Sequence, residues 1–540
     1  MNPEDATPHG TAQGGSPSAG SVIARAASLV MLAYIISNLV GVVRGMVITQ
    51  AFGTSAELDS FNAANRVTEL LFNLMAGGAL GSAFIPTFTG FLTRDDRRGA
   101  WRLASGVVQV VLAVLVAVSV LVWIFAPVLV SRGLFLLVPD SDPVQLDLTV
   151  RLLRIMLPTV IIFGLSGLAM GILNAHQKFL IPALAPAMYS LGMILGTLLL
   201  PQAWGISRLA YGVVAGALGH LLLQLPSLLR LPNRAYQRAV GLKDQAVRQV
   251  LRLMVPRMIG AGVVQLNFVA NTVIALSLGE GAASAVSLAF ALMLMPQAAI
   301  AQSAGTASLP TLSAQVERGA HSEFRDTLVG IIRAVLLLAL PAAVGLILLR
   351  FPLVRVLYQR GSFGETSTQM VAWALLWYAA GLVGHSLVEV LSRAYYALHD
   401  TRTPVVVGVC AMSLNILLSF LLSRWFTTLG LMAHGGLALA NSAATALECL
   451  VLLWLMNKRL GGLSSHKLIN ATAIAALGSA LMGLALTAWL RWQAQSASLV
   501  QLAGGIVIGV LVYGAVAWLT GVPELRAIVS RLQRKLFHRA

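Results

Sequence analysis

Five polar residues with the spacing of one helical face interrupt an otherwise apolar stretch. Asp59, Asn62, Arg66, Glu69 and Asn73 are separated by three, four, three and four positions. Residues at this spacing lie on one side of an α-helix, where they form a polar stripe about 21 Å long at 1.5 Å per residue. Charged side chains inside a membrane usually face a water-filled cavity. We therefore predict that the stripe is a cavity wall that is open to the outer side of the membrane and contacts a substrate; the alternative is a row of hydrogen bonds between helices.

Arginines in other apolar segments are candidates to add positive charge to the same cavity. Arg44 lies well inside the first long apolar stretch, close to Asn38, and Arg257 lies near the start of the seventh. A guanidinium binds a phosphate group through two hydrogen bonds at once, so we predict that these residues contact an anionic ligand. The alternatives are that Arg44 pairs with Asp59 or Glu69 or extends to the membrane surface, and that Arg257 only marks a basic edge.

Polar residues also occur in the later apolar segments. Asn415, Ser419 and Asn441 are candidates to coordinate a cation such as sodium, although such residues more often join helices through hydrogen bonds. Glu389 and Arg393, four positions apart, predict a local ion pair.

The sequence lacks the patterns that enzymes need. It contains no P-loop for ATP, no cluster of His and Cys that would bind a metal, and no catalytic constellation. We therefore expect a transporter without a cofactor, driven by the membrane potential or by a sodium or proton gradient.

Composition sets the class of protein that positions these residues. Of 540 residues, 57% are hydrophobic and only 11% are charged, whereas soluble globular proteins have about 25% charged residues. This excludes a soluble enzyme, a disordered protein and a nucleic-acid-binding protein. The net charge of +17 is better explained by basic loops of a membrane protein. We predict an all-α polytopic membrane protein.

Fourteen apolar segments are long enough to cross a bilayer as helices, which takes roughly 20 residues. They lie near residues 22–50, 58–92, 102–130, 148–173, 179–200, 207–229, 250–278, 284–312, 326–349, 367–394, 404–424, 434–457, 467–490 and 497–520. These segments and the stretches between them divide the chain into regions. We predict a disordered cytoplasmic tail at 1–21, an N-lobe at 22–229 and a basic cytoplasmic linker at 230–249. We further predict a C-lobe at 250–457, a helix pair at 458–520 that forms a groove for a lipid tail, and a basic cytoplasmic tail at 521–540.

A short repeat relates the two lobes. The heptapeptide from Gly81 to Thr87 recurs, with changes, from Gly305 to Thr311. Each copy ends the second apolar segment of a six-segment block. Because six is an even number, both copies cross the membrane in the same direction, which predicts parallel repeats of the kind found in transporters.

Basic residues gather in alternate loops. With fourteen spans, the loops near Arg94, Arg230, Arg402 and Lys458 fall on one side together with both termini. By the positive-inside rule this side is the cytoplasm. The loop that carries Arg350, Arg355 and Arg360 departs from the pattern.

Several motifs resemble the MurJ/MviN family. They are Ser37-Asn-Leu-Val-Gly-Val-Val-Arg44, Ala51-Phe-Gly53, Asp59-Ser-Phe61, Gly78-Ala-Leu-Gly-Ser-Ala-Phe-Ile-Pro86 and Tyr395-Tyr-Ala-Leu-His-Asp400-Thr-Arg402-Thr-Pro404. The resemblance runs from about residue 22 to 520. It implies the fold of the multidrug/oligosaccharidyl-lipid/polysaccharide (MOP) exporter superfamily. It also implies a lipid II flippase of the bacterial cytoplasmic membrane, which moves the undecaprenyl-pyrophosphate-linked peptidoglycan precursor to the outer leaflet by alternating access.

The resemblance holds at some functional positions of the family and fails at others. Arg44 and Asp59 match functional positions of the family, and Arg66 falls where the family often has a basic residue. Asn38 and Phe72 replace charged residues, as do Gly77, Phe290, Ala291 and Leu294. Three alternatives therefore remain: a flippase for another polyprenyl-linked saccharide, a small-molecule antiporter of the same superfamily, and a non-transporting scaffold for cell-wall assembly.

Overall fold

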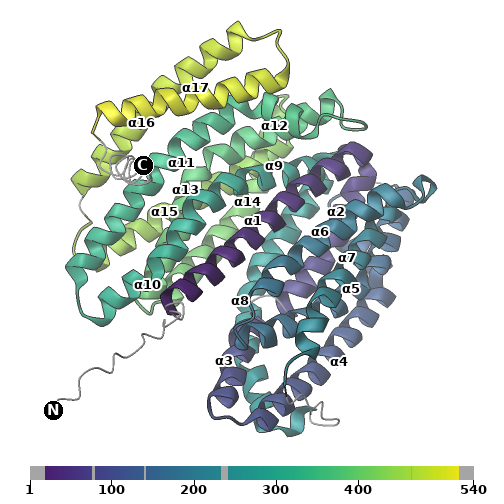
Figure 1. The fold of residues 1–540 in the computed structure, drawn as a ribbon. Helices are drawn as coiled ribbons and strands as arrows, with labels where there is room; N and C mark the ends of the chain where they lie inside the picture. The colour runs from purple at the N-terminus through teal and green to yellow at the C-terminus, as the bar shows by residue number, and fades with distance from the viewer. Residues whose placement is uncertain (1–18, 76–78, 139–141, 233–240, 464, 522–540) are drawn as a thin grey trace, which may run out of the picture.

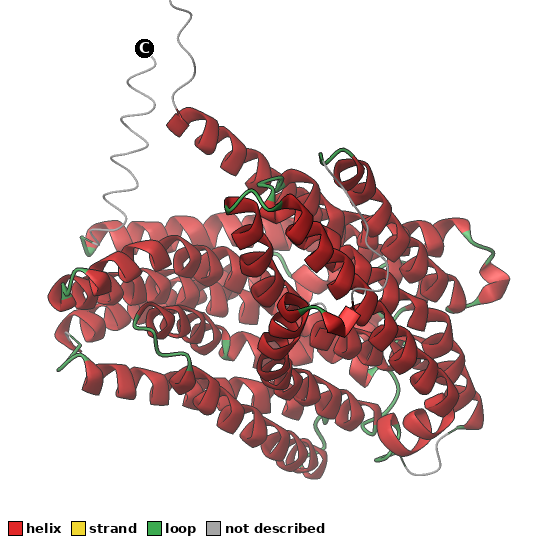
Figure 2. Cartoon of the chain, turned by 90° about the horizontal axis from the view of Figure 1, so that it is seen from below, coloured by secondary structure: helices red, strands yellow, loops and turns green. Residues whose placement is uncertain are grey.

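The computed structural model describes residues 19–75, 79–138, 142–232, 241–463 and 465–521, and within these ranges the chain forms helices and no β-strand (Figures 1 and 2). This confirms the predicted all-α fold class. The N-lobe contains α1 (Ala19–Phe52), α2 (Ala56–Met75), α3 (Ala79–Thr93), α4 (Arg97–Leu129), α5 (Pro143–Ala175), α6 (Leu180–Leu199) and α7 (Ser207–Leu229). Most of the predicted terminal tails, part of the 230–249 linker, and Gly77 lie outside the described residues.

The C-lobe repeats this order. It contains α8 (Gln245–Leu276), α9 (Ala282–Gln297), α10 (Ser303–Glu317), α11 (His321–Tyr358), α12 (Glu365–Ala380), α13 (Leu382–Ala397), α14 (Arg402–Thr428) and α15 (His434–Arg459). Two further helices, α16 (Ser465–Trp492) and α17 (Ser498–Leu519), pack against α11, where the Tyr513 hydroxyl donates a hydrogen bond to the Leu337 carbonyl at 2.5 Å. The lipid-tail groove predicted for this pair stays a prediction.

Local sequence explains where several helices begin. The side chain of Asp96 accepts a hydrogen bond from the Gly99 N–H at the start of α4, and Asp142 accepts one from the Val144 N–H at the start of α5. Asp244 caps α8 in the same way. A carboxylate at this position satisfies backbone N–H groups that have no partner within the helix and interacts favourably with the helix dipole.

The repeat predicted from sequence falls at equivalent places in the two lobes. In the C-lobe a π-helical segment, Ala298–Gln302, joins α9 to α10, and in the N-lobe the corresponding chain is divided into α2 and α3. The repeated proline lies inside α3 as Pro86 and inside α10 as Pro310. A proline inside a helix removes a backbone hydrogen bond, so it favours a bend.

Ten helices are long and apolar enough to cross a membrane, or eleven if the bent pair α12 and α13 is one span, among the described residues. The predicted number of fourteen is therefore not confirmed. In the other three segments, which contain α1, α2 with α3, and α8, the described residues include the shorter apolar stretches Ile36–Phe52, Ala83–Thr93 and Ala261–Leu276.

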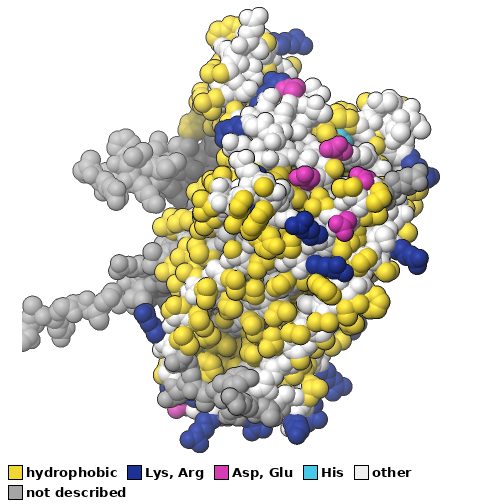
Figure 3. Space-filling model, turned by 90° about the vertical axis from the view of Figure 1, so that its right-hand side faces the viewer, with side chains coloured by type: hydrophobic (Ala, Val, Ile, Leu, Met, Phe, Trp, Pro, Cys, Tyr) yellow, Lys and Arg dark blue, Asp and Glu magenta, His cyan; other side chains and the backbone are white. Residues whose placement is uncertain are grey.

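The surface of the N-lobe suits contact with lipid. α4 exposes Val120, Leu121, Trp123, Ile124 and Phe125 to the outside. Figure 3, which views the N-lobe side, shows hydrophobic side chains across the middle of this face and basic side chains at its lower edge. An apolar belt with charged ends is the pattern of a membrane protein. The chain is therefore a multi-pass membrane protein.

Loops predicted to share one side of the membrane contact each other. Arg102 Nε lies 2.7 Å from the Asp244 carboxylate, and Arg459 Nη1 lies 2.5 Å from that of Asp400. At the other end of the molecule, the Ala56 N–H donates to the Glu280 carboxylate at 3.2 Å. The loops thus sort to two ends as the sequence predicts.

Helix α8 packs against both lobes. Its first half buries Val247, Val250 and Met254 in a hydrophobic cluster with Leu103 and Val107 of α4, which belongs to the N-lobe. Its second half contacts both lobes: Ile274 packs in a hydrophobic cluster with Phe61 of α2, and Asn271 donates a hydrogen bond to Asn415 of α14. In Figure 1 the two lobes meet near the end of α1 and diverge toward the end where α1 begins.

Candidate functional site

A cavity of about 270 Å³ lies between the lobes, enclosed by α1, α2, α6 and α9. We call it the central cavity. Four of the predicted site residues line it, namely Arg44, Asn62, Arg66 and Glu69. The other lining residues are Gly45, Ile48, Thr49, Leu58, Phe61, Asn65, Tyr189, Met193, Ser284, Ser287, Leu288 and Ala291. Two arginines and one glutamate leave the lining with a net positive charge, which suits an anionic ligand.

Arg44 enters the cavity from α1, about halfway buried. Its Nη1 lies 3.5 Å from the Ser190 hydroxyl and 4.0 Å from the Met193 sulfur, both on α6. The ion pair that the sequence suggested with Asp59 or Glu69 does not form, and Arg44 has no ion pair with any described residue. Its guanidinium charge is therefore available to a ligand.

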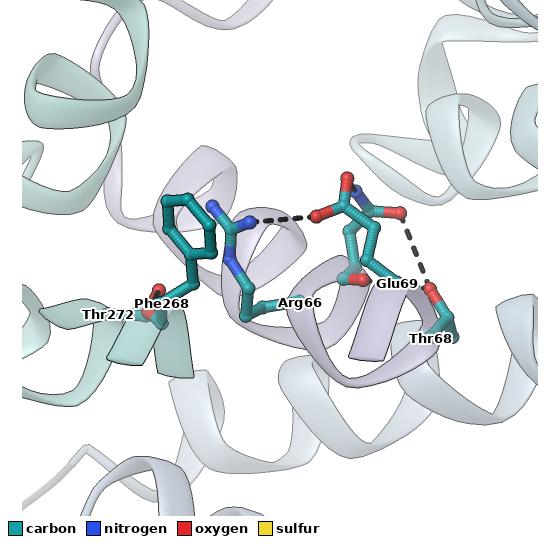
Figure 4. A network of polar contacts seen from close by, with 6 residues as sticks. Arg66, Thr68, Glu69, Phe268 and Thr272 are labelled. Carbon is teal, nitrogen blue, oxygen red and sulfur yellow. Dashed lines mark hydrogen bonds and ion pairs between the residues drawn. The ribbon is translucent and has the colours of Figure 1, made fainter. Parts of the chain in front are cut away.

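Arg66 and Glu69 form an ion pair one helical turn apart on α2, with Arg66 Nη1 2.9 Å from the Glu69 carboxylate (Figure 4). The Asn65 amide donates to the other carboxylate oxygen at 2.8 Å. On its opposite side the Arg66 guanidinium lies 5.2 Å from the ring centroid of Phe268 on α8, within the range of a cation–π contact. Arg66 Nε is buried without a hydrogen-bond partner, so one donor of this guanidinium remains unused.

Asp59 does not line the central cavity, which corrects its predicted place in the cavity wall. It is buried, and its carboxylate accepts hydrogen bonds from the Gly281 N–H at 2.7 Å, the Ser284 N–H at 2.7 Å and the Ser284 hydroxyl at 2.6 Å. Gly281 and Ser284 lie at the start of α9, so Asp59 of α2 caps a helix of the other lobe. Asn62 extends this contact by donating to the Ser284 hydroxyl at 3.0 Å.

Three glycines allow the lobes to approach closely at this end. Gly53, Gly281 and Gly361 all have positive φ, at +61°, +78° and +56°. A Cβ atom on any of them would lie 2.4–2.5 Å from a backbone oxygen of the other lobe. We call this end, where Asp59 and the three glycines lie, the closed end of the molecule.

The remaining predicted substrate residues lie elsewhere. Asn73 lines a second cavity within the N-lobe. Asn38 on α1 and Arg257 on α8 are exposed and line neither this cavity nor the central one. The structure therefore does not place Asn38 and Arg257 with the other candidates.

Asn415 and Ser419 of α14 meet two asparagines of α8 in what we call the asparagine cluster. The Asn271 amide donates to Asn415 Oδ1 at 2.8 Å, and the Asn267 amide donates to it at 3.3 Å. The Ser419 hydroxyl donates to Asn271 Oδ1 at 2.9 Å. The oxygens are neutral and already accept hydrogen bonds, an arrangement that joins the two helices. Sodium binding here stays a prediction.

Asn441 belongs to a different network. Its side-chain oxygen lies 2.9 Å from His385 Nε2, although it shares a small cavity of about 60 Å³ with Asn267 and Asn271. The predicted ion pair of α13 forms, with Arg393 Nη2 2.5 Å from the Glu389 carboxylate.

Several residues of the site were not predicted from the sequence. Tyr189 and Ser190 of α6 contribute to the region around Arg44, and Ser284 of α9 receives Asp59. Single hydroxyl residues in apolar segments are common, so nothing distinguishes these positions. Asn267 and Asn271 were detectable, because two asparagines four positions apart in one apolar segment share a helical face.

Comparisons with known proteins place the chain among transporters. The family profile described as "Lipid II flippase MurJ" matches residues 48–507. The lipid II flippase MurJ of Burkholderia cenocepacia is 32% identical, over 79% of this chain and 82% of that protein. The probable lipid II flippases MurJ of Vibrio cholerae and Bdellovibrio bacteriovorus are 31% and 30% identical, over 90% and 95% of this chain and 94% and 97% of theirs.

Solved structures show the same fold. A structure described as "Lipid II flippase MurJ, inward closed conformation" matches with a TM-score of 0.77 and 24% identity, over 91% of this chain and 98% of that one. An inward-facing multidrug resistance MATE family transporter of the MOP superfamily matches with a TM-score of 0.67 and 14% identity, over 81% and 98%.

Proposed function

We propose that this chain, which belongs to the MurJ family of lipid II flippases, carries lipid II from one leaflet of the membrane to the other by alternating access. The observation that carries the proposal is the central cavity between the lobes, with Arg44 unpaired and Arg66 beside it. A pyrophosphate-linked headgroup is anionic, and it needs a positive, water-accessible site to leave the membrane surface.

In this proposal the two arginines bind the pyrophosphate in different ways. Arg44 offers its guanidinium directly. Arg66 exchanges the Glu69 carboxylate for a phosphate oxygen, and the ion pair forms again once the substrate has left. Glu69 therefore lowers the affinity of the empty cavity for anions, which favours release.

Basic loops assign the direction of transport. Those near Arg94, Arg402 and Lys458 lie at the end toward which the lobes diverge. The loop with Arg355 and Arg360 is the exception, because it lies beside Gly361 at the closed end, where Asp59 and Gly281 join the lobes. By the positive-inside rule the diverging end faces the cytoplasm, so both termini are cytoplasmic and the structure is an inward-facing state. The membrane is the bacterial cytoplasmic membrane.

The membrane potential is a sufficient energy source in this proposal. An inside-negative potential drives anions outward, with about 2.3 kcal/mol per charge and 100 mV. A pyrophosphate headgroup carries more than one negative charge. Collapse of the potential in proteoliposomes is expected to slow outward transport. A separate experiment, in which potassium replaces sodium, tests whether the asparagine cluster also couples the transport of an ion.

Rescue of cells depleted of their own lipid II flippase tests the function. Lipid II exposed on the outer surface is measured with an enzyme that cleaves only accessible lipid II. Restored exposure and growth support the proposal. No restoration, at normal membrane levels of the chain, contradicts it and points to another polyprenyl-linked saccharide or to a scaffold role.

A further inference from the structure

The N-lobe contains a second cavity, of about 430 Å³, between α2, α5, α6 and α7. We call it the N-lobe pocket. It shares Asn65, Glu69 and Tyr189 with the central cavity, so the two adjoin. Its volume is in the range of pockets that hold drug-sized organic molecules. The flippase proposal assigns no role to this pocket.

Aromatic rings from four helices form the walls of the pocket. The Phe163 ring of α5 lies 5.2 Å from that of Phe72 on α2, 5.3 Å from that of Tyr189 on α6 and 5.3 Å from that of His220 on α7, between ring centroids. All four rings line the pocket. Aromatic faces carry partial negative charge, so they attract organic cations as well as apolar groups.

The charge in the pocket lining also favours an organic cation. Glu69 is the lining residue that carries a full charge, and its side chain is 40% exposed. Arg44 and Arg66 line the central cavity but not the N-lobe pocket. Glu69 therefore separates a cationic compartment from an aromatic compartment in which its carboxylate is the charged group.

We propose that the N-lobe pocket binds a lipophilic organic cation, with its apolar body against Phe72, Phe163 and Tyr189 and its charge beside Glu69. The cation competes with Arg66 for the Glu69 carboxylate. The ligand is distinct from the anionic headgroup of the central cavity, and the proposal stands or falls independently of lipid II transport.

Binding of tetraphenylphosphonium to the purified full-length chain in nanodiscs tests the proposal, with uncharged triphenylphosphine oxide as the matched probe. We expect saturable binding of the cation, weakened about tenfold by E69Q. Phe163→Leu keeps an apolar side chain but removes the ring, and it is expected to weaken binding of both probes. Glu389→Gln, which removes the carboxylate of an arginine pair outside the pocket, serves as control and is expected to leave affinity unchanged.

Arg66→Gln is the variant that distinguishes the proposal best from a loss of folding. It removes the competitor of the cation, so affinity for tetraphenylphosphonium is expected to rise about threefold or more. Opposite effects of the two partners of one ion pair do not arise from misfolding, and melting temperatures check each variant. Equal binding of both probes by the wild-type chain, or an affinity for the cation that E69Q leaves unchanged, overturns the proposal.

Discussion

At the scale of the residue, Asp59 joins the two lobes at the closed end of the molecule through hydrogen bonds to Gly281 and Ser284. Asp59→Asn keeps the size of the side chain but leaves one acceptor oxygen where the carboxylate has two, so an N–H of α9 loses its partner. The cost is about 1–3 kcal/mol, and it falls on the inward-facing state alone. We expect the population to shift toward the outward-facing state.

Labelling of a cysteine in the central cavity measures this shift. Ser287→Cys, introduced after Cys410 and Cys449 are replaced by serine, reports access of a membrane-impermeant thiol reagent from outside. Asp142→Asn is the matched control, because Asp142 caps α5 within one lobe. Increased labelling in Asp59→Asn alone agrees with the account; equal labelling in both variants contradicts it.

The candidate site was partly visible in the sequence. The spacing of Arg66 and Glu69 predicted a cavity wall and the depth of Arg44 suggested the same, and all three line the central cavity. In the orientation proposed above, however, this cavity opens to the cytoplasm and not to the predicted outer side. Asp59 shares that spacing, yet it caps a helix from a segment more than 200 residues away. Periodicity gives the face of a helix but does not identify the element opposite to it.

At the scale of the element, Gly281 permits the start of α9 to touch the N-lobe. A Cβ there would lie 2.4 Å from the Thr54 carbonyl oxygen, and φ of +78° also disfavours any side chain. Gly281→Ala is expected to destabilise the closed end and increase outside labelling of Ser287→Cys. Gly279→Ala carries similar backbone strain, with φ of +108°, but meets no atom within 4 Å. It is expected to lower the melting temperature without increasing the labelling.

Helices α6 and α7 cross at four glycines. A Cβ on Gly192, Gly196, Gly212 or Gly216 would lie 2.2–2.7 Å from backbone atoms of the other helix. Small residues allow such close packing in membranes. Gly192→Ala is therefore expected to separate the helices and lower the melting temperature of the purified protein by several degrees. Gly219→Ala, whose Cβ would meet Met188 at an ordinary 3.5 Å, is expected to change it little.

The sequence revealed elements unevenly. The apolar segments of α4 and α11 were long enough to identify directly. The repeated heptapeptides correctly related α3 to α10. The packing of α8 against both lobes was not predictable, because only tertiary contacts show which elements lie against each of its faces.

At the scale of the whole molecule, the distribution of charged loops matches the way in which the two lobes contact each other. Apart from the loop with Arg355 and Arg360, which lies at the closed end, basic loops lie at one end and the contacts of Asp59 lie at the other, with a net positive cavity between them. The sorting of loops was readable from the sequence because lysine and arginine counts need no tertiary information. The inward-facing state was not predictable from the sequence, because it depends on which surfaces of the two lobes contact each other.

Lipid II exposed on the surface of flippase-depleted cells that express variants of Arg44 is the most direct test of the central claim. Arg44 is the cavity arginine without an ion pair among the described residues, so Arg44→Ala removes the principal contact to the pyrophosphate. We expect that the wild-type chain and Arg257→Ala restore exposure, that Arg44→Lys restores part of it, and that Arg44→Ala leaves it at the depleted level. Full exposure in cells with Arg44→Ala, at equal membrane expression, would contradict the account.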